Sequence, residues 1–274
     1  MCNTMQSFFT AFLEFLDHTR EYISTDNGQW KIKGLIDNES NIFSLTNDTK
    51  LISKIIELHL LPELFSFARS INYSIELPRH QNHYPDLTFI NLHDEDIKFA
   101  VDIKTTYRKD SNPNFCNGFT LGSHGRYFKE RNCTKNITYP YNGYLSHFCF
   151  GIIYSRTVNV DNVQSKYRYE QLGVIQSIIN SFDLFFCEKW KIASDKAGSG
   201  NTANIGSVKY IDDILTCNGV FVNLGEHIFD DYWVNYNELN ITKDDGTFKK
   251  LRCIEDYMDY RSLDRGLINK PNRH

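Results

Sequence analysis

A continuous apolar run at residues 146–158, SHFCFGIIYSRTV, is the feature of this sequence that most restricts its fold. The run has the length of a strand and is rich in β-branched and aromatic residues, and its apolar side chains occupy successive rather than alternate positions. Such a pattern is typical of a strand that is buried on both faces. We therefore expect it at the centre of a sheet with helices on either side.

The rest of the chain supplies further strands and helices for such a sheet. Apolar residues recur at helical spacing over residues 5–24, and a long helix is predicted from a cap at Asp48 or Thr49, with Pro62 kinking or dividing it. The strings YSIELP, DLTFINL, IKFAVDIKTTY and DLFFCEKWKIASD read as strands. Residues 30–35 and 42–45 suggest a hairpin, 218–222 a short strand, and 167–181 and 226–240 helices. Without a repeat or a flexible linker, we expect one mixed α/β (α+β) domain over residues 1–274, with a central mixed sheet flanked by helices.

Charge and cysteine content limit the cellular setting and leave the partner open. Lys and Arg number 30 and Asp and Glu 34, giving a net charge of −4 that does not itself favour nucleic acid but does not exclude a local basic groove. No stretch approaches the ~20 apolar residues of a membrane span. Seven scattered cysteines in a chain that starts without a basic leader predict reduced thiols, a cytoplasmic location and no zinc site.

Three charged side chains are candidates for a catalytic centre. Asp86 opens one predicted strand, and Asp102 and Lys104 lie on one face of the next. A hairpin between the two strands would bring Asp86 beside Asp102, where a cation such as Mg²⁺ would relieve the repulsion between the carboxylates. Such a cation could neutralise charge on a phosphodiester and lower the pKa of a water molecule. The ammonium of Lys104 could hold that water or stabilise the intermediate.

Each of these patterns also has an ordinary structural interpretation. Pro-Asp is a common turn element, Asp-x-Lys often lies on a solvated strand face, and a lone Glu57 on an amphipathic helix is usually exposed. The string GSGNTAN is more often a mobile surface turn than a binding loop. Its glycines would nevertheless let the backbone approach base edges, and Asn201 and Asn204 could each pair with an adenine.

Longer strings resemble a known family. QNHYPD at 81–86, DIKTTY at 102–107 and AGSGNTANIGS at 197–207 closely resemble, in the same order, the EcoRV-like type II restriction endonucleases. The resemblance covers residues 30–240 and implies the PD-(D/E)xK nuclease fold with Mg²⁺ as cofactor. The tail after about residue 240 scarcely matches, and residues 108–118 form a longer and different loop.

The resemblance also implies roles for single residues. Asp86, Asp102 and Glu57 would bind the metal, and Lys104 would be the catalytic lysine. A recognition loop at 197–207 would enter the major groove, a second loop would reach the minor groove, and other residues would meet phosphates. The residues implied to bind DNA are Gly198, Ser199, Gly200, Asn201, Thr202, Ala203, Asn204, Gln81, Asn82, Lys50, Thr106, Lys135 and Arg156. Ala203 replaces a threonine of the family, and His80 replaces a glutamine.

The resemblance implies a homodimeric restriction endonuclease that cuts double-stranded DNA at GATATC. Cleavage would be blunt and would leave 5′-phosphate and 3′-hydroxyl ends, and a cognate DNA methyltransferase would protect the host. One alternative is a structure-selective repair nuclease of the same fold, which would prefer branched DNA to an intact plasmid. Another is a non-catalytic DNA-binding module, which would bind DNA equally with and without metal.

Overall fold

The central sheet is built around the strand that the apolar run predicts. The structure is a computed structural model that describes residues 2–158, 164–198, 203–242 and 246–272. β8 (Ser146–Arg156) is an interior strand, second in a six-stranded mixed sheet of order β10-β8-β5-β4-β3, in which β6 also pairs with β5. Its partners are parallel β5 (Lys98–Lys109) and antiparallel β10 (Ile179–Glu188). The sheet is completed by β3 (Tyr73–Glu76), β4 (Leu87–Asn91) and β6 (Asn112–Cys116). The predicted mixed sheet is confirmed.

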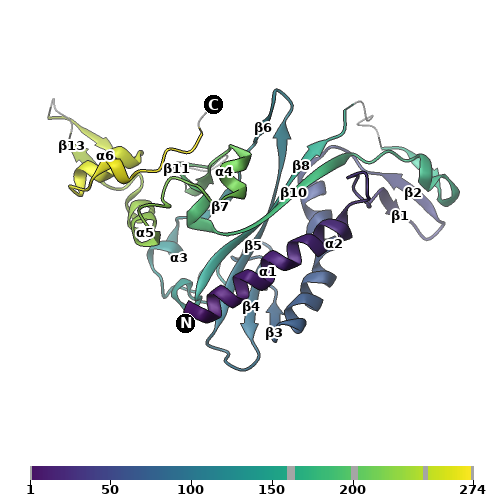
Figure 1. The fold of residues 1–274 in the computed structure, drawn as a ribbon, viewed down its shortest axis with the longest axis horizontal. Helices are drawn as coiled ribbons and strands as arrows, with labels where there is room; N and C mark the ends of the chain where they lie inside the picture. The colour runs from purple at the N-terminus through teal and green to yellow at the C-terminus, as the bar shows by residue number, and fades with distance from the viewer. Residues whose placement is uncertain (1, 159–163, 199–202, 243–245, 273–274) are drawn as a thin grey trace.

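Two long helices cover one face of this sheet (Figure 1). They are α1 (Cys2–Ile23) and α2 (Thr49–Ser70), and α2 runs through Pro62 as one helix. Phe8 and Phe12 of α1 pack with Phe99 of β5 and Phe186 of β10 in a buried aromatic core. Burial of this apolar surface holds the helices on the sheet, at roughly 25 cal/mol for each Å² removed from water.

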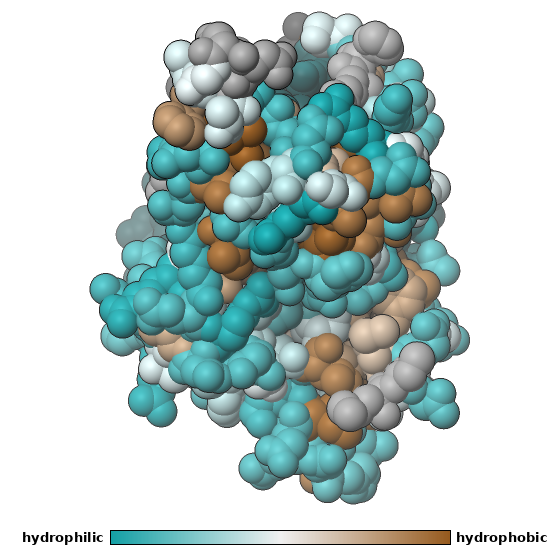
Figure 2. Space-filling model, turned by 90° about the vertical axis from the view of Figure 1, so that its left-hand side faces the viewer, coloured by the Kyte–Doolittle hydropathy of each residue, from teal (hydrophilic) through white to brown (hydrophobic). Residues whose placement is uncertain are grey.

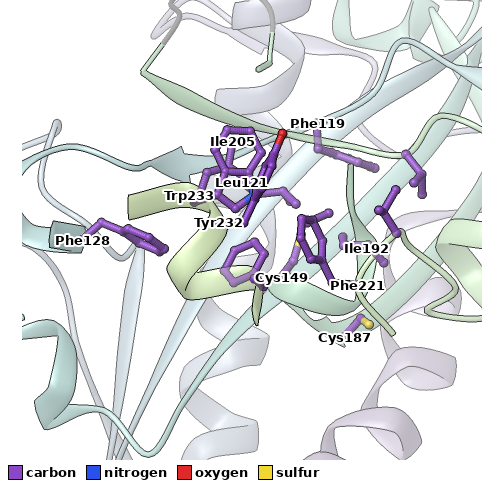
Figure 3. Close-up of a cluster of buried hydrophobic side chains, with 14 of the residues drawn as sticks. Phe119, Leu121, Phe128, Cys149, Cys187, Ile192, Ile205, Phe221, Tyr232 and Trp233 are labelled. Atoms are coloured by element: carbon purple, nitrogen blue, oxygen red, sulfur yellow. The ribbon is translucent and has the colours of Figure 1, made fainter. Parts of the chain in front are cut away.

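A second core lies on the opposite face. It is formed by a three-stranded sheet and by short helices of the C-terminal half, which Figure 3 shows gathering Phe119, Leu121, Ile205, Tyr232 and Trp233 into one apolar cluster. The strands, in the order β11-β12-β7, are β7 (Thr120–Ser123), β11 (Ala193–Ala197) and β12 (Asn204–Ser207). The helices are α4 (Ile211–Leu215), α5 (Glu226–Asn235) and α6 (Ile254–Tyr260). Because this core borders the sheet that carries β11 and β12, it fixes the base of the predicted recognition loop.

Two small sheets lie at opposite ends of the molecule (Figure 1). One contains β1 (Gly34–Ile36), β2 (Asn41–Ser44) and β9 (Lys166–Arg168), and the other β13 (Asn240–Thr242) and β14 (Phe248–Lys250). The remaining short helices are α3 (Arg126–Lys129), η1 (Tyr141–Gly143), η2 (Tyr169–Val174), η3 (Lys189–Ile192) and η4 (Arg265–Leu267). The end that carries β13 and α6 faces the viewer in Figure 2, where hydrophilic residues predominate and apolar patches are separate.

Several predicted elements differ from those observed. The helix expected over 167–181 is wrong, because β9, η2 and the start of β10 occupy that stretch. The strand expected over 183–195 is interrupted by η3, and no strand forms among residues 218–222, all of which are described. The helix expected to reach residue 240 ends at Asn235.

One pair of cysteines also differs from expectation. Cys187 of β10 and Cys217 form a disulfide, so the prediction of reduced thiols is wrong for these two residues. Thirty residues separate them in sequence, and only the packing of α4 beside β10 brings their Cα atoms within 6.2 Å. Within the described ranges, no helix combines the length and apolar character that a membrane crossing requires.

Candidate active site

The two predicted catalytic aspartates meet where β4 joins β5. Leu87 lies opposite Val101 in the antiparallel register, so the preceding Asp86 falls opposite Asp102. The backbone N–H of Asp86 donates to Asp102 Oδ1 over 3.2 Å, and the backbone N–H of Ile103 donates to Asp86 Oδ2 over 2.8 Å. These two bonds hold both carboxylates at one edge of the sheet. The side chain of Ile103 points into the α1–α2 core, as the alternation along the strand predicts.

The ammonium of Lys104 binds both carboxylates. Its Nζ lies 3.0 Å from Asp102 Oδ2 and 3.3 Å from Asp86 Oδ2. The side chains of Asp102 and Lys104 are 10% and 24% exposed, and that of Asp86 is 32% exposed, so the cluster is partly shielded but open to solutes at Asp86. The predicted acid–acid–ammonium arrangement therefore exists as one contact set.

The proximity of the charges alters their protonation. Burial raises the pKa of Asp86 to about 6, and the neighbouring Asp102 acts in the same direction, while Lys104 partly opposes both. Burial disfavours the charged form of Lys104, but the two carboxylates outweigh it and raise the pKa of the ammonium above its ordinary value. Lys104 therefore carries its positive charge at neutral pH.

The cluster opens into a cavity of about 480 Å³. Gln81, Asn82 and Lys135, which were predicted to contact DNA, line the same cavity. Residues that the sequence did not single out also line it, namely Ser123, Arg126 and Tyr127. Only their position in β7 and α3, folded against the strand ends, identifies them as neighbours of the carboxylates. The lining of the cavity combines two carboxylates with the cations of Lys104, Arg126 and Lys135, which suits a phosphodiester backbone.

Glu57 lies in an adjoining hollow. That hollow is lined by Ser53, Glu57, Thr105 and Thr120 and shares Lys104 with the first cavity. The carboxylate of Glu57 is paired with Lys54 at 2.6 Å. Within the described residues, no cluster of three His, Cys, Asp or Glu side chains is placed to hold a metal ion. The structure therefore does not bring Glu57 together with Asp86 and Asp102.

The two aspartates alone nevertheless fit Mg²⁺. This cation retains several waters and typically binds through one or two carboxylates together with substrate oxygens. Asp86 and Asp102 supply hard oxygen donors, and the adjoining cavity leaves room for water and a phosphate. A soft-metal site is not favoured here, because the nearby Cys149 thiol is buried and its pKa is raised by that burial.

The remaining predicted DNA contacts fall into two groups. Lys50 and Thr106 line a third hollow that also contains Glu57 and Gln81, next to the catalytic strand. Arg156, at the end of β8, does not line these hollows. Its guanidinium stacks over the ring of Tyr107 at 4.1 Å and pairs with Asp110 at 2.6 Å. Asp110 belongs to the turn between β5 and β6, in the longer loop that the sequence showed.

The predicted recognition loop connects β11 and β12. The backbone N–H of Gly198 donates to the carbonyl of Asn204 over 2.8 Å, which closes the base of the loop. The carbonyl of Ala203 accepts from the N–H of His124 over 2.9 Å, which ties the loop to the segment after β7. Ser199, Gly200, Asn201 and Thr202 lie outside the described residues.

Comparison with known proteins agrees with this arrangement. The sequence matches a family model described as "Restriction endonuclease EcoRV" over residues 26–262. It is also similar to the type II restriction enzyme EcoRV of Escherichia coli, with 36% identity over 236 residues. That match covers 86% of this chain and 92% of the bacterial enzyme.

Proposed function

Because this chain belongs to the EcoRV family of type II restriction endonucleases, we propose that it uses Mg²⁺ to cut both strands of GATATC bluntly at the centre. Site-specific cleavage of DNA is the activity of the family, while the base sequence, the cut position and the metal are our proposals. The loop string AGSGNTANIGS supports the proposed site, since its glycines and asparagines suit adenine readout in the major groove. The deformable TA step at the centre of GATATC would add selectivity through bending.

The observation that carries the proposed chemistry is the convergence of Asp86, Asp102 and Lys104. Asp86 and Asp102 would hold the Mg²⁺, which when bound neutralises charge on the phosphate and makes a water more acidic. The ammonium of Lys104, anchored by both carboxylates, would orient the attacking water and stabilise negative charge on the phosphorane. In-line attack on phosphorus, with departure of the 3′ oxygen, leaves a 5′-phosphate and a 3′-hydroxyl.

Plasmid digestion tests this proposal. With Mg²⁺, we expect plasmid carrying one GATATC site to be linearised, and sequencing of the ends to show a blunt cut between T and A. Ca²⁺ should support binding without cleavage. Asp102→Ala should bind DNA but not cut it, whereas Asp96→Ala, at an exposed acid in the turn before β5, should cut like the wild type. Staggered ends, a different site, or cutting by Asp102→Ala would each contradict part of the proposal.

We also propose that the enzyme is a homodimer, with one active site for each strand of a palindrome. The sheet β1-β2-β9 and the adjoining η2 support this proposal, because they leave large apolar side chains in solvent at one end of the molecule. Ile36 is 61% exposed and Val174 is 69% exposed, and Leu35 and Leu172 are also exposed. Exposed apolar side chains gathered on this sheet and on η2 mark an interaction surface, which we assign to the contact between two copies of the chain.

The cellular partners follow from the same activity. An endonuclease that cuts a six-base site would damage its own host, so we propose a cognate methyltransferase and a shared cytoplasmic location. Expression in a host that lacks methylation at GATATC should induce DNA damage, and co-expression of an adenine methyltransferase for that site should prevent it. Equal survival with and without the methyltransferase would contradict this part of the proposal.

A further inference from the structure

A buried lysine lies between the catalytic and the recognition segments. Lys189 is 4% exposed, and its Nζ has no hydrogen-bond partner among the residues that the structure describes. The ammonium faces three aromatic rings, with centroids at 4.7 Å for Tyr141, 5.0 Å for Tyr84 and 5.4 Å for Phe128. Attraction between a cation and these rings replaces only part of its lost hydration.

The rings around Lys189 support the segment Tyr84-Pro85-Asp86, called here the catalytic turn. Tyr84 immediately precedes Pro85 and Asp86, and its hydroxyl bonds to His147 Nδ1 over 2.8 Å. The other ring nitrogen of His147, Nε2, lies 3.0 Å from the carbonyl oxygen of Tyr141. The ring therefore donates from Nε2 and accepts from Tyr84 at Nδ1. Burial, with Lys189 nearby, lowers the pKa of His147 well below its ordinary value and keeps it in this neutral form. A closed polar and aromatic network thus holds the segment that presents Asp86.

The backbone of Lys189 belongs to the recognition side. It begins η3, which leads directly into β11 and the base of the recognition loop at Gly198. The carbonyl of Ile192, at the end of η3, accepts from the N–H of Val208 just after β12. Both strands that carry the loop are therefore attached to the short helix that begins with Lys189.

Charged groups from other elements surround the ammonium at longer range. Asp102 of β5 and Asp230 of α5 favour the charged form of Lys189, and Arg131 opposes it. Glu226, also on α5, favours the charged form as well. Lys189 is thus linked to Tyr84 by a cation–π contact and to Asp102 by electrostatic attraction. Its backbone leads through η3 into β11. Within the described residues, Lys104 is the cation that contacts the catalytic acids, so Lys189 acts at one remove.

We propose that Lys189 is a positioning residue that couples the recognition strands to the catalytic turn, so that a correctly read sequence is required to align Asp86. The inference rests on the proposed function, because it assigns Lys189 a part in the same cleavage reaction. When bound DNA shifts β11 and β12, the ammonium of Lys189 moves with η3 and carries the Tyr84 ring with it. A misread site leaves η3 and the catalytic turn out of alignment.

Three variants test this proposal. Lys189→Met keeps the length of the side chain and removes its charge, and Lys189→Arg restores a cation. Lys191→Met is the matched control, because Lys191 lies in the same short helix but is 38% exposed and paired with Glu188 at 2.5 Å. Each variant is compared with wild type for binding to its mapped site in Ca²⁺. Single-turnover cleavage in Mg²⁺ is then measured at saturating enzyme, for that site and for one with a single mismatched base pair.

For Lys189→Met we expect cleavage of the correct site to slow by about tenfold or more, equivalent to one factor of ten in rate per 1.4 kcal/mol of barrier. The affinity of Lys189→Met for its site in Ca²⁺ should stay within about threefold of the wild-type affinity, which is a smaller change in free energy than a tenfold effect. Cleavage of the mismatched site should change little, so discrimination falls. Lys189→Arg should recover most of the rate, and Lys191→Met should match the wild type. Thermal stability of Lys189→Met should equal or exceed that of the wild type, because an unpaired buried charge is removed.

Results that would overturn the coupling can be told apart from results that would overturn the proposed function. Wild-type rates in Lys189→Met, or an equal slowing at correct and mismatched sites, would overturn the coupling. A lower melting temperature for Lys189→Met would show that the ammonium stabilises the fold, and would also overturn it. Because the assays use whichever site the wild-type enzyme is mapped to cut, failure of the GATATC proposal leaves this test intact. Failure of the wild type to cut any DNA would instead remove the proposed function.

Discussion

At the scale of single residues, the proposed active site combines two carboxylates with the ammonium of Lys104. Lys104 already neutralises much of the repulsion between Asp86 and Asp102, with contacts of 3.0 and 3.3 Å. The pKa of Asp86 is still raised to about 6, chiefly because the carboxyl is buried. A divalent cation bound by these carboxylates would add to the stabilisation of their negative charge that Lys104 provides.

Removal of the resident ammonium should separate binding from chemistry. We expect Lys104→Gln to reduce single-turnover cleavage by about 10²–10³-fold, the usual effect of losing one group that stabilises transition-state charge. Affinity for DNA in Ca²⁺ should change only a few-fold. The control is Lys98→Gln at the start of the same strand, where Lys98 lies over the ring of Tyr139, away from the carboxylates. If Lys98→Gln slows cleavage as much as Lys104→Gln, the specific role of Lys104 is wrong.

The buried charge of Lys189 should make stability depend on alkaline pH. Burial lowers the pKa of Lys189 to about 8 in the folded chain, below the ~10.4 expected when unfolded. Below pH 8 both states bind the proton, and the folded state bears the full cost of the charge. Between these two pKa values the unfolded state binds more protons, so this contribution to stability rises with pH.

Lys189→Met lacks this titration, so its advantage over wild type should be largest near pH 7 and shrink by pH 9.5. The difference at pH 7 should be on the order of 3 kcal/mol at most. Urea unfolding of both proteins at several pH values measures it, and an advantage that grows with pH would contradict the assignment. The titratable and charged groups that interact with Lys189 are Asp102, Asp230, Glu226, Arg131, Tyr84, Tyr141 and His147.

At the scale of elements, α2 positions one wall of the site through a well-defined start. Asp48 is its N-cap, and Asp48 Oδ1 accepts from the N–H of Leu51 over 2.8 Å. We expect Asp48→Ala to lower the free energy of unfolding by about 1 kcal/mol, because a helix N–H loses its acceptor. Denaturant titration gives the value. Asp17→Ala in α1, where the carboxylate is 84% exposed, should change stability by less than about 0.5 kcal/mol and serves as the reference.

Elements with a strong local pattern were predictable, and those set by tertiary contacts were not. The buried run gave β8, and helical spacing with a cap gave α1 and α2. Residues 167–181 carry helix-compatible spacing, yet β9 pairs with β2 and β10 with β8, and these long-range ladders override local preference. The segment 183–195 looked like one strand because η3, which leads the chain from one sheet to another, contains no glycine or proline to mark the end of β10.

The same division holds within the site. Asp86, Asp102 and Lys104 were predictable because strand alternation and a hairpin place them together from sequence alone. Arg126 was not predictable, because α3 reaches the cavity only through folding of the second core. The packing of Lys189 against Tyr84 and Tyr141 depends on the same folding and was equally hidden. Pairing of Arg156 with Asp110 was equally hidden, since it depends on where the β5–β6 turn lies beside the end of β8.

At the scale of the whole molecule, both ends of the molecule leave large apolar side chains exposed. The sheet β1-β2-β9 exposes the aliphatic side chains Leu35 and Ile36, and the end seen in Figure 2, where hydrophilic residues predominate, also exposes Phe248, Leu263 and Leu267. We assign the dimer contact to the sheet β1-β2-β9. We expect the protein to be a dimer by light scattering, and Ile36→Asp to shift it toward monomer, because a charge would have to be buried in the contact.

The monomeric variant should lose double-strand cleavage while keeping its fold. Leu92→Asp is the matched control, since Leu92 is 58% exposed at the turn between β4 and β5, outside that sheet. Dimers of unchanged stability in Ile36→Asp, or dissociation in Leu92→Asp, would place the contact elsewhere.

The pairing of Arg156 with Asp110 affects how strongly the protein would bind DNA that lacks its recognition site. Any polyanion that reaches this guanidinium must first displace a carboxylate of the protein itself, so the exchange gains little unless other contacts form at the same time. A carboxylate that competes with phosphate in this way weakens non-specific DNA binding more than it weakens specific binding, in which many contacts form together. The excess of acids over bases in this chain is then compatible with a search among many wrong sites.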